Sequence, residues 1–139
     1  RGRVTGRGLL LPQTHDTVRS DVTVFDYLRA RLPVYADDAE RLLEAYLFGP
    51  DQWRRPLRAI SAGELRRLLL AIMANSPSRI LLLDEPTNYL DLDALEVTEQ
   101  ALAGFRGTLL VVTHDARFAA AIGCTHTWHV TGSRLVRTG

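Results

Sequence analysis

Three stretches of the chain place apolar side chains three and four residues apart, which is the spacing of a helix with one buried face. They predict helices over residues 22–32, 37–48 and 65–73. We expect Asp21 to cap the first of these helices and Pro33 to end it. Residues 51–59 are polar and basic, which favours a connector between the second and third helices.

Three shorter apolar runs predict strands. Residues 8–11 end at Pro12, and residues 80–83 and 108–112 are largely apolar and bounded by polar residues. Such runs are typical of strands that are covered on both faces in a parallel sheet. We therefore expect residues 108–112 to form a second buried strand.

The remaining elements complete an alternating order. Asp93 and Glu96 have the spacing of a capping box and predict a helix that extends to about residue 103. Residues 116–122 predict a short helix, and residues 127–137 predict a closing hairpin. After residue 60 helices and strands alternate, which predicts an α/β fold with a mostly parallel sheet. Residues 22–60 lack a strand signal and are interpreted as a helical insertion.

Composition narrows the class of protein. The chain has 139 residues, of which 46% are hydrophobic and 24% charged, and a net charge of +1, which is typical of one soluble globular domain. Its longest apolar runs are too short to span a bilayer. The abrupt start at Arg1 leads us to expect a piece of a larger protein. The single cysteine, Cys124, excludes an internal disulfide and is expected to be buried.

The basic residues exclude further chemistry. All 17 are arginines, so these residues contain neither a G-x-x-x-x-G-K-[ST] phosphate loop nor a lysine for Schiff-base catalysis. A solvated helical face and contact with ribosomal RNA are the two interpretations of their densest group. That group consists of Arg54, Arg55, Arg58, Arg66 and Arg67.

The strongest chemical signal is a pair of acids, Asp84 and Glu85, directly after the predicted strand 80–83. The end of a strand is where α/β folds place ligands. Carboxylates beside buried apolar residues are costly unless a cation meets them, and Mg²⁺ is the usual cation where phosphate is the substrate. Asp84 would then face the metal while Glu85 orients a water. A pair of solvated acids is the alternative.

Weaker signals lie at three other positions. Ser61 and Glu64 have capping-box spacing, and Gly63 between them would let an anion approach the free N–H groups of a helix start. An ordinary cap is the alternative. His114 follows the predicted strand 108–112 and Gln13 follows residues 8–11; taken alone, they are more typical of a structural histidine and a surface glutamine.

In combination and in this order, the motifs resemble the second half of an ATP-binding cassette (ABC) ATPase, over about residues 9–130. The segment Ile60 to Glu64 resembles the signature motif, Ile80 to Glu85 resembles Walker B, and Asn88 to Asp91 resembles the D-loop. His114 resembles the switch histidine and Gln13 the Q-loop glutamine.

The resemblance implies a fold and its division. The fold would be a partial P-loop NTPase-type parallel sheet with flanking helices and a helical insertion, the signature subdomain. Residues 1–139 would be a partial ABC ATPase domain, in which about 22–75 form the helical subdomain while 1–21 and 76–139 belong to the core sheet.

The resemblance also implies the residues that act on ATP bound to this cassette. Glu85, His114 and Gln13 would be catalytic. Asp84 and Gln13 would hold Mg²⁺. Glu85 would polarise the attacking water, and His114 would contact the γ-phosphate.

A second cassette is the implied partner, in a head-to-tail sandwich with two ATP molecules. Ser61, Ala62, Gly63 and Glu64 would bind the ATP held by that partner, and Asp91 would bridge the two cassettes.

Details of the motifs resemble the ABC-F group in particular. These are the run from Glu85 to Asp91, the Glu64 of the signature, and Phe105-x-Gly107 before the last core strand. This resemblance implies a cytoplasmic protein with two cassettes and no transmembrane domain, which hydrolyses ATP on the ribosome and in some members protects it from antibiotics. The alternative is the nucleotide-binding domain of an ABC membrane transporter.

The sequence departs from the family pattern at two points that bear on ATP binding and hydrolysis. The Walker A loop is missing and would lie upstream of Arg1, so these residues alone are expected to lack ATPase activity and to bind nucleotide weakly. Ala62 replaces the usual first glycine of the signature, and its Cβ narrows the approach to phosphate. A degenerate cassette used only for binding is therefore a third interpretation, against which Glu85 and His114 argue.

Overall fold

The computed structural model describes residues 7–11 and 15–138. Its central sheet has three parallel strands in the order β1 (Gly8–Leu11), β2 (Ile80–Asp84) and β3 (Thr108–Val112). The register aligns Leu11 with Leu83 and Asp84 with Val112, so the carboxyl ends of all three strands share one edge. The predicted α/β class with a parallel sheet and flanking helices is confirmed.

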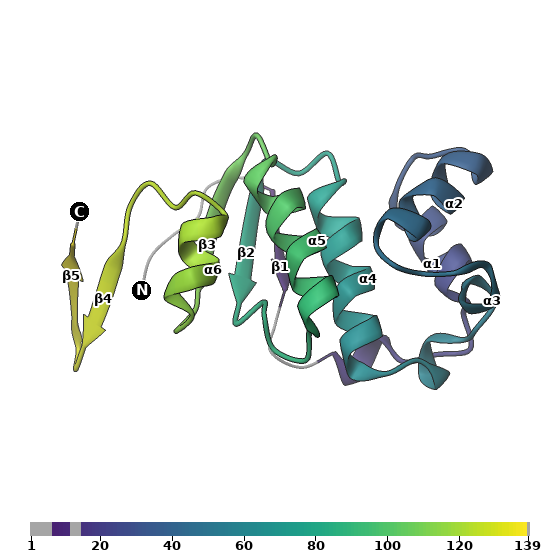
Figure 1. Ribbon diagram of the computed structural model, residues 1–139, viewed down its shortest axis with the longest axis horizontal. Coiled ribbons are helices and arrows are strands. Elements are labelled where there is room, and N and C mark those ends of the chain that lie inside the picture. Colours follow the sequence, from purple (N-terminus) through teal and green to yellow (C-terminus); the bar gives the residue numbers. More distant parts are fainter. Residues whose placement is uncertain (1–6, 12–14, 139) are drawn as a thin grey trace.

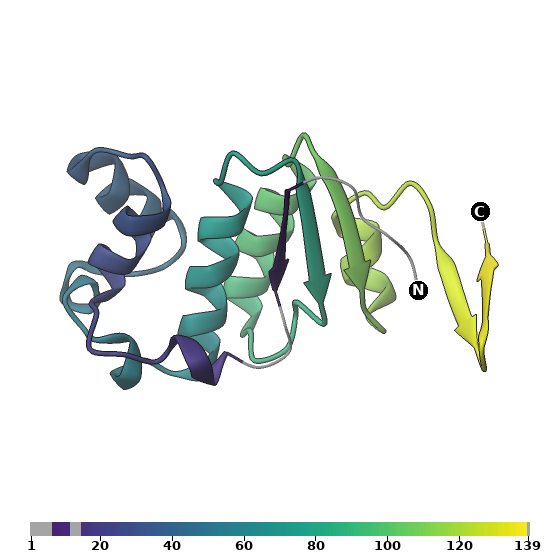
Figure 2. The same cartoon turned by 180° about the vertical axis from the view of Figure 1, so that it is seen from behind.

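Helices cover one face of this sheet. Figures 1 and 2 show α4 (Ala62–Ala74), α5 (Leu92–Ala103) and α6 (Ala116–Ala121) on the same side of the strands. Leu81 and Leu83 point to that side and are buried together with Leu11 and Phe118. Alternate positions along a strand face opposite ways, so these leucines form one half of the apolar pattern of β2.

The expectation that residues 108–112 are buried on both faces is wrong for the described chain. Leu110 and Val112 are 49% and 59% exposed. β3 lies at the edge of the three-stranded sheet, and its alternate residues Leu109 and Val111 pack against the core under the helices. Its other face has no cover among the described residues, and Leu10 on the same face of the sheet is also exposed.

A second core holds the helical insertion together. α1 (Val24–Arg31), α2 (Ala36–Ala45) and α3 (Pro50–Trp53) pack with one face of α4, around fully buried Leu28, Leu43, Phe48 and Leu57. The predicted connector is therefore partly helical, since it contains α3 and a 3-10 turn at Leu57–Ala59. Leu70 and Met73 of α4 point instead into the core under the sheet. Helix α4 thus belongs to both cores.

Two predicted helix starts are wrong by two residues. Thr23, not Asp21, caps α1, because its side chain accepts a hydrogen bond from the Asp26 N–H. Asp91, not Asp93, caps α5 by accepting from the Ala94 N–H. In both cases the true cap is a Thr or Asp three residues before the N–H that it binds, the geometry that stabilises a helix start.

The chain ends in the predicted hairpin, β4 (Trp128–Thr131) paired with β5 (Arg134–Arg137). Figures 1 and 2 show it at the end of the molecule opposite to α1–α3. All of its residues are exposed, and Cys124 ahead of it is exposed as well, contrary to the expectation of burial. Within the described part of the chain, no helix is both long and apolar enough to cross a membrane.

Substitutions in α2 test the second core. Leu43→Ala removes a side chain with 0% exposure and is expected to lower the free energy of unfolding by about 2–5 kcal/mol. The exposed neighbour Glu44→Ala is the control, with a change of about 0.5 kcal/mol or less. Urea denaturation measures both. Nearly equal effects of the two substitutions would contradict the packing of α2.

Candidate functional site

The two groups singled out after the strands meet at the carboxyl edge of the sheet. His114 Nδ1 lies 2.9 Å from Oε1 of Glu85. The backbone supports this contact, since the Glu85 N–H donates to the carbonyl of Val112, at 2.8 Å, one residue beyond the ladder. Because a carboxylate only accepts, the Nδ1–H of His114 donates. The hydrogen bond to Glu85 raises the pKa of His114.

The two side chains differ in their surroundings. The Glu85 side chain is 15% exposed, whereas that of His114 is 81% exposed. Glu85 Oε2 is buried and has no hydrogen-bond partner among the described residues. An unpartnered buried carboxylate oxygen is costly, so it marks a position where a water or a ligand donor would be bound.

Glu85 also has an unusual backbone. Its φ of 44° lies in the left-handed region, which costs a non-glycine residue on the order of 1–3 kcal/mol. The turn takes the chain out of β2 immediately after Asp84, and the Asn88 N–H closes it by donating to the Glu85 carbonyl at 3.2 Å. The side chain is thereby directed across the end of β3.

Arg66 of α4 holds this turn from beneath. Its side chain is completely buried, and its guanidinium donates to the carbonyl oxygens of Asp84, at 2.7 Å, Glu85 and Pro86. Burial lowers the pKa of Arg66, and the nearby negative charge of Asp84 acts in the opposite direction. Three consecutive carbonyls, at the last paired residue of β2 and in the turn after it, thus receive donors from one side chain.

His15 contacts the other side of the same guanidinium. Its Nε2 lies 2.5 Å from Arg66 Nη1, and only 8% of the residue is exposed. Burial, followed by the charge of Arg66, lowers the pKa of His15 to about 4. His15 is therefore neutral at pH 7, and its Nε2 accepts the hydrogen bond because a guanidinium only donates.

The predicted cap at the start of α4 is formed in part. Ser61 Oγ accepts from the Glu64 N–H at 3.0 Å. The Glu64 side chain does not complete a capping box; its Oε2 accepts from Gln52 at 3.3 Å and lies 3.5 Å from Arg55 Nη1. Ala62 is exposed beside Ser61 at the helix end. The Glu64 side chain is thus bound by Gln52 and Arg55 of the helical insertion.

Gly63 has a packing role that the sequence did not reveal. A Cβ added to Gly63 would clash with the carbonyl oxygen of Tyr89. Tyr89 itself has a left-handed φ of 67° and lies in the predicted D-loop. The start of α4 and the turn at Tyr89 therefore approach each other closely, and only glycine allows that approach.

The remaining predicted site residues lie as follows. Asp91 follows Tyr89 and caps α5 with its Oδ1, which accepts from Ala94 at 2.9 Å. Asp84 is half-buried at the end of β2. Gln13 lies outside the described residues.

A magnesium site is compatible with these groups only if other ligands complete it. The described residues contain no group of three or more His, Cys, Asp or Glu side chains that could hold a metal ion. Mg²⁺ commonly binds through one or two carboxylates together with phosphate oxygens and waters. The half-buried carboxylate of Asp84 fits that sparse mode.

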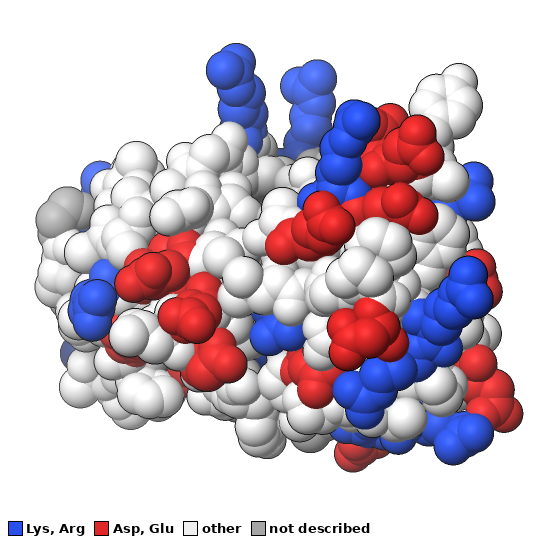
Figure 3. Space-filling view, turned by 45° about the vertical axis from the view of Figure 1, so that its right-hand side comes forward, with Lys and Arg blue, Asp and Glu red and all other residues white. Residues whose placement is uncertain are grey.

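The dense arginine group is not one basic surface. Arg66 and Arg67 are buried, and Arg67 packs its guanidinium over the Phe48 ring at 4.6 Å. Arg55 and Arg58 form ion pairs with acidic side chains. Figure 3 shows blue and red side chains interspersed on the face that it presents. The interpretation as a solvated or RNA-binding face is therefore wrong for the two arginines of α4.

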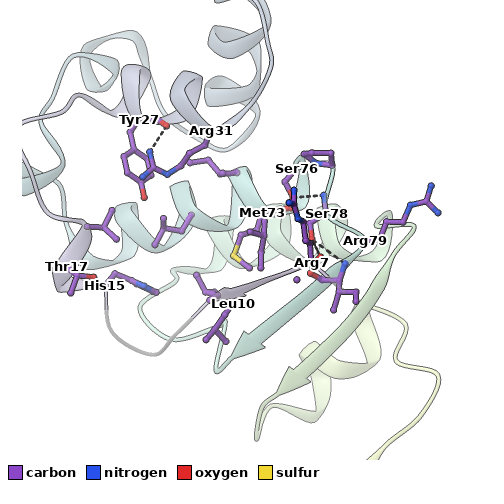
Figure 4. Close-up of a pocket in the computed structure, with 18 residues that line it drawn as sticks. Arg7, Leu10, His15, Thr17, Tyr27, Arg31, Met73, Ser76, Ser78 and Arg79 are labelled. Carbon is purple, nitrogen blue, oxygen red and sulfur yellow. Dashed lines mark hydrogen bonds between the residues drawn. The ribbon is translucent and has the colours of Figure 1, made fainter. Parts of the chain in front are cut away.

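A pocket of about 950 Å³ opens elsewhere, between β1, α4 and α1. Figure 4 shows Leu10, Met73 and Tyr27 around it, with His15 at one end. Neither Glu85 nor His114 lines it. The predicted chemistry and this apolar hollow are therefore separate features.

Sequence reasoning missed two residues of the site, Arg66 and His15. Both interpretations of the dense arginine group place Arg66 on an exposed face, and His15 belongs to no motif. The usable signal was the placement of Arg66 one residue beyond Leu65 within an apolar helix stripe, which marks a position close to the core.

Comparisons with known proteins show the family to which the chain belongs. The family model described as ABC transporter matches residues 4–88. The ATP-binding protein Uup of Escherichia coli strain K12 is 47% identical over 76 residues, which cover 55% of this chain and 12% of the relative. The Probable ATP-binding protein YbiT of Escherichia coli O157:H7 is 32% identical over 120 residues, covering 84% of this chain and 22% of the relative.

A solved structure extends the likeness to the fold. The archaeal ribosome recycling factor aABCE1, in complex with the ribosomal stalk protein aP1, matches with a TM-score of 0.69 and 25% identity, over 88% of this chain and 25% of that chain. The chain therefore spans only a minor part of each of these proteins.

The matched residues 4–88 make up more than half of the chain and contain the signature and Walker B segments. The chain belongs to the ABC transporter family, its residues form part of an ATP-binding cassette, and its similarity to the Uup proteins supports the resemblance to the ABC-F group.

Proposed function

We propose that this chain supplies the hydrolytic edge of an ABC ATPase that cleaves the γ-phosphate of ATP. The observation that carries the proposal is the Glu85–His114 contact of 2.9 Å, with the second carboxylate oxygen of Glu85 buried and unpartnered. One oxygen is oriented by the imidazole, and the other is left to accept a hydrogen bond from a water. A carboxylate in this arrangement is suited to act on an attacking water.

The roles of the residues follow from their positions. Glu85 accepts a proton of the attacking water, a contribution that is typically about 10²–10⁴-fold in rate. His114, exposed above it, donates through Nδ1 to Glu85, and in its protonated form its Nε2–H would donate to a γ-phosphate oxygen. Gln13 remains a proposed ligand and catalytic group, after the strand that ends at Leu11.

The proposed metal ligand is Asp84, with Gln13 as its partner. Mg²⁺, when bound, neutralises charge on the β- and γ-phosphates. Asp84 ends β2 one residue before Glu85, so the two carboxylates are neighbours at the carboxyl edge of the sheet. In this proposal Asp84 serves the metal and Glu85 serves the water.

The cassette is completed by segments beyond these residues. We propose the boundaries expected from sequence, with residues 22–75 as the helical subdomain and residues 1–21 and 76–139 as part of the core. The free edge of β3 and the exposed Leu110 and Val112 support the packing of further core structure there, including the Walker A loop.

A second cassette provides the other half of each ATP site. Ser61 and Ala62 are exposed at the N-terminus of α4, where free N–H groups favour a phosphate. We propose that these residues, with Gly63 and Glu64, contact the ATP of the partner cassette. Asp91, exposed after Tyr89, would face the same partner.

Glu85→Gln in the full-length protein tests the hydrolytic role. The amide keeps the shape of the side chain but cannot accept the proton, so the turnover number is expected to fall about 100-fold or more. ATP affinity is expected to stay within about threefold, because the role of Glu85 belongs to the transition state. Steady-state phosphate release and equilibrium ATP binding measure the two quantities. Unchanged turnover would overturn the assignment.

We propose that the intact protein works on ribosomes in the cytoplasm, in the manner of the ABC-F group. Support comes from the similarity to Uup and YbiT and, more distantly, to a recycling factor whose structure includes a ribosomal stalk protein. Protection of ribosomes from antibiotics is a narrower form of the same proposal. The transporter nucleotide-binding domain is the competing function, and a catalytically inert binding module is disfavoured by the Glu85–His114 contact.

Co-sedimentation distinguishes these functions. The full-length Glu85→Gln protein, loaded with ATP, is expected to pellet with purified ribosomes and to be released as salt rises, because contacts to RNA phosphates displace counterions. The same protein without nucleotide is the control and is expected to stay largely in the supernatant. Recovery in the membrane fraction, with no ribosome binding, would favour the transporter.

A further inference from the structure

We propose that Arg66 is a positioning residue for ATP hydrolysis, which holds Glu85 in its working geometry and links it to His15. The inference rests on the proposed function, since it assigns a residue that acts through Glu85. It is carried by the hydrogen bonds of a completely buried guanidinium to three consecutive carbonyls and to His15.

The first step of the argument concerns the turn. The pairing of β2 ends at Asp84, so the carbonyls from this residue onward need donors from outside the ladder. Arg66 donates to all three, through Nη2 to the first two and through Nε to the third. The planar guanidinium therefore binds the backbone of the turn that positions the Glu85 carboxylate.

The second step concerns the conformation that is held. Glu85 adopts a left-handed φ of 44°, which a non-glycine residue keeps only when its surroundings impose it. The Glu85 N–H is fixed by Val112, while its carbonyl accepts from the Asn88 N–H and from Arg66. Loss of the guanidinium would remove one of these two donors together with the donor to Pro86, so the turn would be held less firmly and the carboxylate would be aimed less accurately at His114.

The third step concerns the opposite side of the guanidinium. His15 Nε2 accepts from Arg66 Nη1 at 2.5 Å, and both residues are buried. The hydrogen bond therefore connects His15 to α4 and, through Arg66, to the turn after β2.

Arg66→Lys tests the role of the guanidinium, because lysine keeps the positive charge but lacks the planar set of N–H donors. A single ammonium cannot reach three carbonyls and an imidazole with the geometry of a guanidinium. Arg67→Lys is the matched control. Arg67 is the next residue of α4 and is also buried, but it contacts Phe48 and the carbonyl of Leu47 rather than the turn.

The experiment measures ATP turnover and KM in the full-length protein. Arg66→Lys is expected to lower kcat about 10- to 100-fold with KM for ATP within about threefold, the signature of a lost transition-state interaction. Arg67→Lys is expected to stay within about twofold in both constants. Turnover of Arg66→Lys equal to that of Arg67→Lys would overturn the proposal.

A double substitution separates positioning from a general loss of structure. If Arg66 acts through Glu85, then Arg66→Lys in a Glu85→Gln background is expected to change the residual rate by less than about twofold. A further fall as large as that of the single Arg66→Lys variant would mean that Arg66 does not act through Glu85. The Glu85→Gln single variant tests the proposed function itself, because full turnover of that variant would overturn the function. If turnover falls in Glu85→Gln but not in Arg66→Lys, only this inference is overturned.

A pair of changes at His15 keeps the test valid if Arg66→Lys does not fold, which thermal unfolding would reveal. His15→Phe retains the ring but removes the acceptor, and is expected to lower kcat about three- to tenfold, whereas His15→Gln retains an acceptor and is expected to recover most of the rate. Equal rates for the two variants would contradict the link.

Discussion

The register of two parallel strands governs this site. β2 and β3 pair so that Asp84 lies beside Val112, and the next N–H, that of Glu85, binds the Val112 carbonyl. A shift of one residue would reverse the faces of β2 and carry Glu85 away from His114. The packing of Leu81 and Leu83 under the helices opposes such a shift, because it would expose both side chains. Apolar burial on one face of the sheet therefore sets the position of charged groups at its edge.

Helix α4 connects this edge to the helical insertion. It contributes to both cores, with Leu68 in one and Leu70 in the other. Its start carries the exposed Ser61, its first turn touches the backbone of Tyr89 at Gly63, and its middle sends Arg66 to the Glu85 turn. Helix α4 thus contacts the Tyr89 turn at its start and the Glu85 turn further along.

The use of arginine alone gains a physical sense at these positions. Guanidinium presents several donors in a plane and stays charged when buried, whereas a buried ammonium is a compact charge with a readily shifted pKa. Arg66 distributes donors over three carbonyls, and Arg67 lies over an aromatic ring while donating to Leu47, whose backbone is left-handed. In both cases the arginine satisfies a stretch of backbone that neither helix nor sheet can serve.

Local pattern in the sequence determined the strands at residues 80–84 and 108–112, the alternation with helices, and the carboxylate pair at a strand end. These features depend on neighbouring residues, which is why periodicity and turn chemistry reveal them. The contacts that decide how the site is held join residues distant in sequence, since Arg66 is 51 positions from His15 and 18 from Asp84. The exposure of β3 likewise depends on which elements cover it, and the need for glycine at position 63 on a carbonyl 26 positions away at Tyr89. Only the tertiary structure decided these, because no local pattern records which distant backbone a side chain will meet.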